Sequence, residues 1–437
     1  MKQVKVNFDK TTGTIKPMHG VGQPPILGNE YHMFDYLKEA KIPYSRLHDV
    51  GGDYGGNRYV DIPNLFRDFD ADPYDPESYD FAFTDLLVTN LVERGIEPFF
   101  RLGVSIENYA RIKAYRIYPP KDNLKWAQIC EGVIRHYTEG WANGFHYDIE
   151  YWEIWNEPDN QEEIMINEMW RGTKEQYYEL YGVVSKYLKE KFPHLKIGGY
   201  ASCGFYAILE EKTVIAEAKS SSRTEYFLEF FEGFLQYVKK HHCPLDFFSW
   251  HSYSSIEDNV KFATYARKRL DEEGFADTEH TLNEWNCKPL LKGTLEHAAL
   301  TCSMMLALQN TSLDSAMFYD ARCDMGNYSG MFHPMTYKPH PAYYGFLAFS
   351  ELYCRKNQTE VIMDIPGVYA CAAKGDTACL VIANTNAQDV DVSVEVTKGY
   401  DVTKCMLIAK NSIWKKCSLP ASLPKHSVIC VYYNEFK

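Results

Sequence analysis

A (β/α)8 TIM barrel with a small antiparallel β-sandwich accessory domain is the α/β fold that the sequence predicts. The chain of 437 residues has the length of one large α/β domain plus a modest second domain. Between about residues 15 and 355, short apolar runs alternate with amphipathic stretches, as in βα units repeated in series. After about residue 356 the pattern changes to short strands separated by turn residues.

Eight short segments have the composition of barrel strands, because strands buried on both faces are rich in apolar, β-branched and aromatic residues. They are Met18–Gln23, Ile42–His48, Ile96–Gly103, Ile149–Trp155, Lys196–Ala201, Leu245–His251, His280–Trp285 and Ala316–Asp320. Apolar residues at helical spacing predict helices over Tyr79–Arg94, Leu124–Trp141, Lys174–Lys191, Glu225–Lys240, Val260–Glu273, Leu295–Gln309 and Tyr343–Leu352. A long series of βα units favours a closed parallel barrel over an open sheet.

The two ends of the chain are predicted to form the second domain together. Strands are expected over Val368–Ala373, Cys379–Asn384, Val390–Val396, Met406–Lys410 and Val428–Tyr433. The run Gln3–Phe8 reads as a strand with no place in the barrel, so we expect it to join the sandwich. The predicted boundaries are residues 1–14 for this strand, 15–355 for the barrel and 356–437 for the sandwich.

Composition narrows the class of partner. A formal net charge of -13 argues against a nucleic acid or an anionic membrane, and no apolar stretch approaches the length of a membrane span. A neutral partner such as a sugar fits better. Aromatic residues make up 15% of the chain, with 33 tyrosines, and aromatic faces stack on pyranose rings. A large hydrophobic core would explain the same number of aromatic residues. An edge of the sandwich could mediate oligomerisation, so a homo-oligomer is possible.

The cysteines and the N-terminal residues bear on the cellular compartment. The segment MKQVKVNFDKTTG lacks the apolar region of a signal peptide, so a cytoplasmic protein is expected. Twelve cysteines are scattered singly, without a CxxC pair, which favours reduced thiols over six disulfides and over a zinc ribbon. The sequons at Asn310, Asn327 and Asn357 are then chance matches.

Two glutamates stand where barrel strands are predicted to end. Glu157, within Asn156-Glu157-Pro158, follows the fourth strand, and Glu284 lies at the end of the seventh. Side chains at the carboxyl ends of barrel strands meet at the active-site mouth. Two carboxylates across such a mouth are what glycosidic cleavage requires, one as a protonated acid and one ionised beside the anomeric carbon. A turn that happens to contain Glu157 is the competing interpretation.

Other side chains at strand ends are candidates for sugar contacts. His48 ends the second strand, His251 and Tyr253 lie at the end of the sixth, and Tyr319 and Arg322 lie at the end of the eighth. A buried structural histidine is the alternative for each imidazole. No metal site and no cofactor are predicted, because the adjacent pair His241-His242 projects about 100° apart on a helix and His333 and His340 lack partners at ligand spacing.

These motifs resemble glycoside hydrolase family 39, the β-xylosidases and α-L-iduronidases, through about residues 40–350. The resemblance is carried by Arg46-Leu47-His48, Tyr79-Asp80-Phe81, Pro119-Pro120-Lys121-Asp122 with Trp126, Trp152 to Pro158, Ile197-Gly198-Gly199, Asp246 to Tyr253 and Asn283-Glu284. It implies a retaining enzyme with Glu157 as acid/base, Glu284 as nucleophile and Asn156 as donor to the sugar 2-hydroxyl. His48, His251 and Tyr253 match positions that line the sugar site.

The resemblance leaves the substrate open. It favours an exo-acting β-xylosidase on oligosaccharides or small glycosides, but Tyr319 stands where xylosidases of the family tend to carry tryptophan. Arg322 could pair with a uronic acid carboxylate, or it could form an ion pair with Asp320 or Asp324. An ion pair with one of the two aspartates is favoured. A uronide, an arabinoside or a galactoside is therefore an alternative substrate. A catalytically silent sugar-binding barrel is the alternative of another class.

Overall fold

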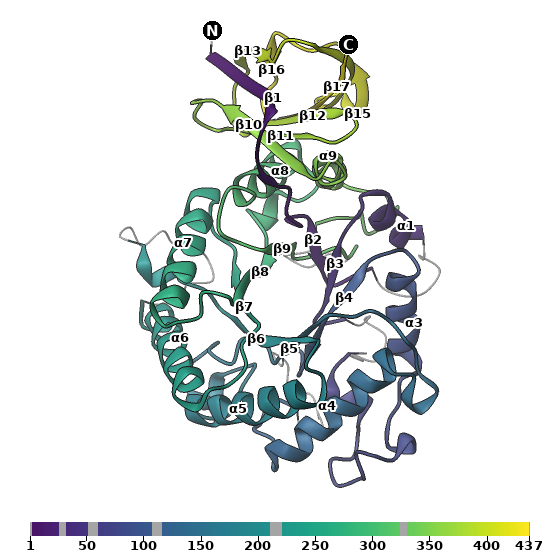
Figure 1. Cartoon of the computed structure of the whole chain (residues 1–437), viewed down its shortest axis with the longest axis vertical. Coiled ribbons are helices and arrows are strands. Elements are labelled where there is room, and N and C mark those ends of the chain that lie inside the picture. Colours follow the sequence, from purple (N-terminus) through teal and green to yellow (C-terminus); the bar gives the residue numbers. More distant parts are fainter. Residues whose placement is uncertain are drawn as a thin grey trace.

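Eight parallel strands close into a barrel, as the sequence predicts (Figure 1). The computed structural model describes residues 2–25, 32–50, 60–106, 116–209, 221–323 and 330–436. In order around the barrel the strands are β2 (Gly20–Gly22), β3 (Tyr44–Leu47), β4 (Glu97–Leu102), β5 (Tyr151–Ile154), β6 (Lys196–Ser202), β7 (Phe247–Ser252), β8 (Glu279–Trp285) and β9 (Ser315–Phe318).

Helices surround the barrel, and capping residues in the sequence mark where some of them begin. The seven predicted ones are α3 (Ala82–Val92), α4 (Asn123–Thr138), α5 (Lys174–Lys191), α6 (Ser221–His241), α7 (Ile256–Glu272), α8 (Leu295–Leu308) and α9 (Pro341–Tyr353). Asp122 caps α4 by accepting from the amides of Leu124 and Lys125, and Thr173 forms a capping box with Gln176 at α5. The prediction missed α1 (His32–Glu39) and α2 (Ile62–Leu65), which are too short to show a helical period.

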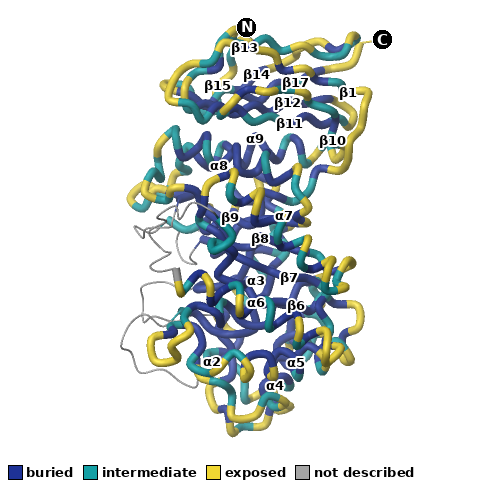
Figure 2. The backbone as a smooth tube through the Cα atoms, turned by 90° about the vertical axis from the view of Figure 1, so that its left-hand side faces the viewer, coloured by how far each residue is buried: buried dark blue, intermediate teal, exposed yellow. Residues whose placement is uncertain are grey.

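The barrel core is filled mainly by apolar and aromatic side chains. Large buried members are Trp126, Trp152, Trp155, Trp170, Trp250 and Trp285. Figure 2 shows the barrel strands as a continuous buried layer beneath partly exposed helices. A fully buried aromatic side chain contributes about 1.5–3 kcal/mol of transfer free energy. This core holds the strand ends in a fixed arrangement.

The second domain is one nine-stranded sheet that both ends of the chain build. Its order is β15-β14-β17-β12-β11-β10-β1-β13-β16. The strands are β1 (Lys2–Thr14), β10 (Asn357–Ile362), β11 (Val368–Lys374), β12 (Ala378–Asn384), β13 (Val390–Val396), β14 (Tyr400–Ala409), β15 (Ser412–Cys417), β16 (Ser422–Leu423) and β17 (Ser427–Glu435). All pairings are antiparallel except that of β1 with β13, which is parallel.

The sheet packs on the barrel through α8 and α9, where β11, β12 and β17 face the two helices (Figures 1 and 2). Buried residues from the sheet, among them Val381 and Val428, belong to the same apolar cluster as the barrel core. The sheet therefore supports the helix that follows β8, the strand that carries Glu284. The twelve cysteines are free, and nine of them are buried. Among the described residues, the helices are too short or too polar to cross a membrane.

Candidate active site

Glu157 stands at the carboxyl end of β5 in an unusual backbone conformation. The strand ends at Ile154, and the chain then turns through Asn156 and Glu157 before Pro158. Glu157 has φ of 44°, which is costly for a residue with a side chain, and its amide donates to the carbonyl of Ala201 at 3.0 Å. Strain of this kind is kept where a side chain must be aimed.

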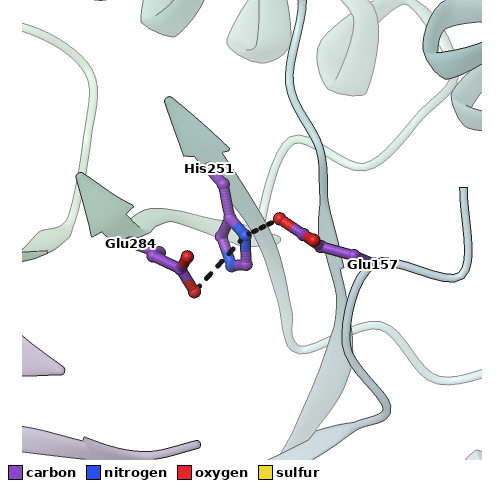
Figure 3. A group of neighbouring side chains, drawn as sticks. All are labelled: Glu157, His251 and Glu284. Atoms are coloured by element: carbon purple, nitrogen blue, oxygen red, sulfur yellow. Dashed lines mark hydrogen bonds and ion pairs between the residues drawn. The ribbon is translucent and has the colours of Figure 1, made fainter. Parts of the chain in front are cut away.

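Glu284 approaches from β8 and is buried. His251 on the neighbouring strand β7 is in register with it. The imidazole Nδ1 of His251 lies 2.7 Å from Glu157 Oε1 and 3.5 Å from Glu284 Oε2, so the ring stands between the carboxylates (Figure 3). One oxygen of each glutamate and one imidazole nitrogen lie within 4.8 Å of one another. The fourth and seventh strands of the barrel, β5 and β8, thus bring together the two glutamates that the sequence predicts as catalytic.

Burial and neighbouring charges set the protonation of this trio. Burial raises the pKa of Glu284, and the charge of Glu157 raises it further against the opposing charges of His251 and Arg46. Burial also raises the pKa of Glu157, but hydrogen bonds from His251 and Asn160 and nearby positive charges bring it below its ordinary value. Burial lowers the pKa of His251, yet the two carboxylates outweigh it and raise the pKa. The pKa of Glu157 thus lies below and that of His251 above its ordinary value, so a proton on the Glu157–His251 contact favours the imidazole.

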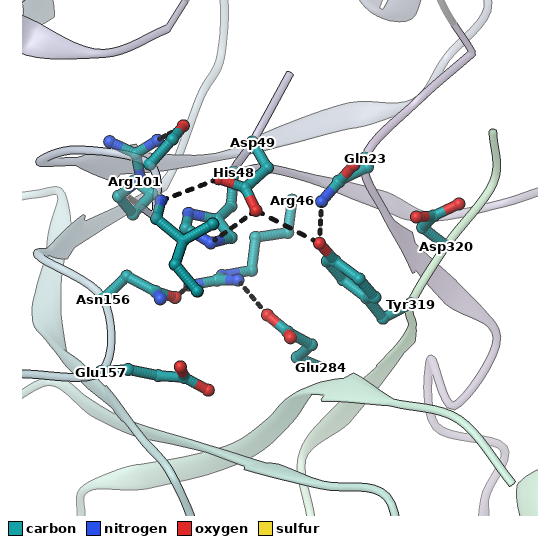
Figure 4. Close-up of polar contacts among 12 residues, drawn as sticks. Gln23, Arg46, His48, Asp49, Arg101, Asn156, Glu157, Glu284, Tyr319 and Asp320 are labelled. Carbon is teal, nitrogen blue, oxygen red and sulfur yellow. Dashed lines mark hydrogen bonds and ion pairs between the residues drawn. The ribbon is translucent and has the colours of Figure 1, made fainter. Parts of the chain in front are cut away.

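Arg46 connects the trio to the barrel interior (Figure 4). Its guanidinium donates to Glu284 at 3.1 Å, to Asn156 Oδ1 at 2.5 Å and to Glu153 at 2.8 Å. Glu153 also accepts from the Asn283 side-chain amide at 2.5 Å. Arg46 lies in the motif Arg46-Leu47-His48 and Glu153 in the motif from Trp152 to Pro158, but neither residue had a predicted role. Their signal was a charged residue inside an apolar strand, because a buried charge requires a partner.

Of three further predicted residues, Tyr253 contacts the trio directly, and Tyr319 and His48 are linked to it through Tyr253 and Asp49. The Tyr253 hydroxyl donates a short hydrogen bond to Glu284 Oε1. His48 is buried at the end of β3, with Nε2 3.5 Å from Asp49 Oδ2. Tyr319 packs edge-on against Tyr253 at 6.3 Å between ring centroids. All three therefore belong to one polar cluster.

Arg322 is held by its neighbour. Its backbone amide and guanidinium both donate to the Asp320 carboxylate, with an ion-pair distance of 2.9 Å. The pairing with Asp320 that the sequence analysis favoured is present, while Asp324 and the sequon at Asn327 lie outside the described residues. The side chain of Asp320 is wholly buried and that of Arg322 is 15% exposed.

Two carboxylates and an imidazole are also donors that divalent metals accept. Within the described ranges, Glu157, His251 and Glu284 are the cluster of His, Cys, Asp and Glu compact enough for an ion. The positive charge of Arg46, 3.1 Å from Glu284, opposes a cation there, so the arrangement suits proton transfer better. His241 and His242 are exposed at the end of α6, where the His241 ring stacks on Tyr237.

The fold and this pair of glutamates define the class of protein, a glycoside hydrolase barrel. Comparison with known families agrees: residues 43–291 match the model of glycosyl hydrolases family 39. The chain belongs to that family, as the sequence motifs indicated.

Two curated relatives bear the name β-xylosidase. One from Geobacillus stearothermophilus is 25% identical over 254 residues, which are 55% of this chain and 43% of the relative. Another from Caldicellulosiruptor saccharolyticus is 26% identical over 235 residues, which are 48% of this chain and 41% of the relative. The matched region thus spans less than half the length of either relative.

Solved structures share the whole fold. A glucosidase from Croceicoccus marinus superposes with a TM-score of 0.76 at 22% identity, covering 100% of both chains. A monomeric β-xylosidase from Caulobacter crescentus gives a TM-score of 0.69 at 15% identity, again over 100% of both chains. At these identities the likeness extends to the barrel and its accompanying sheet.

Proposed function

We propose that the chain is a retaining, exo-acting glycosidase of the β-xylosidase kind, with Glu157 as acid/base and Glu284 as nucleophile. The observation that carries the proposal is the approach of one oxygen of each glutamate to within 4.8 Å, with His251 between them. Carboxyl groups about 5–5.5 Å apart suit direct attack on the anomeric carbon, whereas inverting enzymes keep about 6.5–9.5 Å for a water.

The surroundings of each glutamate support its role. Glu284 contacts Arg46 and Tyr253, both of which stabilise an anionic nucleophile. Glu157 shares a proton with His251, so a proton is available at the leaving group and can return to the pair when water attacks. Because Asn156 Oδ1 accepts from Arg46, its amide NH2 is the group left for a substrate hydroxyl.

The first step then joins Glu284 to the anomeric carbon as a glycosyl ester while Glu157 protonates the departing oxygen. In the second step Glu157 accepts a proton from water, which attacks the anomeric carbon, displaces the Glu284 carboxylate and releases the sugar with its original configuration. The nucleophile and the acid/base of this cycle are thus both side chains of the protein, and water is the second reactant.

The test is hydrolysis of 4-nitrophenyl β-xyloside beside the matching glucoside, galactoside, arabinoside and glucuronide, with the first-formed anomer identified by NMR. Retained configuration is expected, and an inverted product overturns the mechanism. Stepwise release of xylose, which shortens each xylo-oligosaccharide by one unit at a time, supports exo action, while early cleavage at internal linkages contradicts it. No cleavage of any glycoside, with sugar binding intact, favours a silent sugar-binding barrel.

A further inference from the structure

Three polar side chains form a row at the ends of three neighbouring barrel strands. Gln23 follows β2, Asp49 follows β3 and Tyr319 follows β9. The Gln23 amide Nε2 donates a short hydrogen bond to the Tyr319 hydroxyl, which donates to Asp49 Oδ2 at 3.3 Å (Figure 4). We call these residues the Gln23–Tyr319–Asp49 row.

The row adjoins the reacting groups on the side away from the acid/base. Tyr319 meets Tyr253, whose hydroxyl donates to Glu284. In Figure 4 the row and Glu157 lie on opposite sides of Arg46 and Glu284. The leaving group of a glycosidase lies beside its acid/base, so the opposite side receives the ring positions that do not react.

One buried atom of the row points to a ligand. Gln23 is wholly buried, and its Oε1 has no hydrogen-bond partner in the described part of the chain, although buried acceptors are nearly always satisfied. Gln23 and Asp49 also have positive φ values, 44° and 51°, so the turns that follow β2 and β3 direct both side chains into the row. A donor such as a sugar hydroxyl would satisfy the amide oxygen.

The charge of the row restricts which sugar fits. Asp49 is a nearly buried carboxylate, so a uronic acid placed against the row brings a second negative charge to it. The neighbouring cation Arg322 contacts the Asp320 carboxylate at 2.9 Å. A neutral sugar, by contrast, offers only hydroxyl donors.

We propose that the Gln23–Tyr319–Asp49 row binds the non-reacting hydroxyls of a neutral sugar and rejects uronides. The inference rests on the proposed function and assigns to it the side chains that select the sugar. Tyr319 positions the Asp49 carboxylate through its hydroxyl, and Gln23 holds the Tyr319 hydroxyl in turn. Hydrogen bonds to a charged acceptor typically change kcat/KM about 10–100-fold when one partner is removed.

The experiment compares 4-nitrophenyl β-xyloside with its 3-deoxy and 4-deoxy analogues on the wild type, Asp49→Asn and Tyr319→Phe. The wild type should lose about 10–100-fold in kcat/KM on at least one deoxy analogue. That penalty should shrink below about threefold in Asp49→Asn and fall between the two in Tyr319→Phe. An undiminished penalty in Asp49→Asn overturns the proposal, as does wild-type cleavage of 4-nitrophenyl β-glucuronide at a rate comparable with the xyloside.

The matched control is Tyr343→Phe, which removes a buried hydroxyl that bonds Tyr36 and Glu39 outside the site. It should keep the wild-type deoxy penalty. If no glycoside is cleaved, the proposed function fails by itself. Calorimetric affinities of methyl β-xyloside and its deoxy analogues, measured on the wild type and Asp49→Asn, then decide the role of the row without turnover.

Discussion

Arg46 and Glu153 form an ion pair of 2.7 Å in the barrel interior, with at most 1% of either side chain exposed. The other end of the Arg46 guanidinium contacts Glu284 at 3.1 Å. Glu153 therefore shares the positive charge that the nucleophile would otherwise receive alone. Glu153 is therefore a positioning residue, because it acts on Glu284 through Arg46.

We expect Glu153→Gln to move the acid limb of the pH–rate profile to lower pH. The pKa of Glu284 lies above its ordinary value because of burial and Glu157, and Arg46 opposes that shift. Without the Glu153 charge, Arg46 lowers the pKa of Glu284 further, so the nucleophile ionises at lower pH and attacks less readily. We expect kcat/KM to fall about 10-fold or more. We also expect the unfolding free energy to fall by roughly 3 kcal/mol, because Arg46 loses a buried partner.

The control for that variant is Glu279→Gln. Glu279 lies at the opposite end of β8 and pairs with Lys196 at 2.6 Å. This substitution should leave both pH limbs where they are in the wild type. An unchanged acid limb in Glu153→Gln would reduce its role to folding.

These examples show what the sequence could and could not predict. The two glutamates were found because a strand end is a local signal and the barrel brings such ends together. The Arg46–Glu153–Asn283 contacts join strands far apart in the sequence, so only the closed barrel reveals them. The contact of Gln23 with Tyr319 could not be predicted for the same reason. The strands of the second sheet that went unpredicted, β10, β15 and β16, are short or mostly polar, so their alternation is weak.

His251 should set the basic limb of the pH–rate profile. Its raised pKa, above the ordinary 6.5, lets the Glu157–His251 pair keep one proton at neutral pH. Activity is lost as pH rises and that last proton leaves. In His251→Gln the proton must stay on Glu157 alone, so the basic midpoint of kcat/KM should fall by about one unit or more. A basic limb unmoved by the substitution would assign it to another group.

Three buried histidines should make the fold sensitive to acid. Burial lowers the pKa of His19 to about 3, that of His280 to about 3 and that of His297 to about 4. The unfolded chain takes up protons below about pH 6.5, while the folded chain resists until much lower pH. Each histidine therefore lowers the unfolding free energy by about 1.4 kcal/mol per pH unit as the pH falls below 6.5.

The measurement is the urea midpoint of the wild type, His19→Gln and His194→Gln at pH 7 and pH 5.5. His19→Gln should weaken the pH dependence, because glutamine does not titrate. His194 is exposed, so the matched change there should leave the dependence intact. Equal slopes for wild type and His19→Gln would contradict the argument.

The number of free thiols tests the expectation that the protein works in a reducing compartment. All twelve cysteines should react with a thiol reagent in denaturant, and few should react in the native protein, where Cys354 is the exposed one. Burial raises the pKa of most of these thiols, for example Cys287 to about 12, which slows their oxidation. Several disulfides in non-reducing mass analysis would contradict both the free thiols and the cytoplasmic expectation.

The two glutamates are separated by chemical rescue. Glu284→Ala removes the nucleophile, so turnover of both activated and natural glycosides should fall about 10⁴-fold or more. Azide can occupy the vacated space and attack the anomeric carbon directly, which gives a glycosyl azide of inverted configuration. Arg46 and Tyr253, which contact Glu284, remain to receive the anion.

Glu157→Ala should behave differently, because an aryl glycoside with a good leaving group needs little acid assistance. Its first step survives and the glycosyl ester on Glu284 accumulates, while substrates with poor leaving groups lose far more. Azide then attacks that ester from the side where water would enter, so the glycosyl azide keeps the original configuration. NMR of both azide products decides the assignment. Retained product from Glu284→Ala together with inverted product from Glu157→Ala would mean that the two roles are reversed.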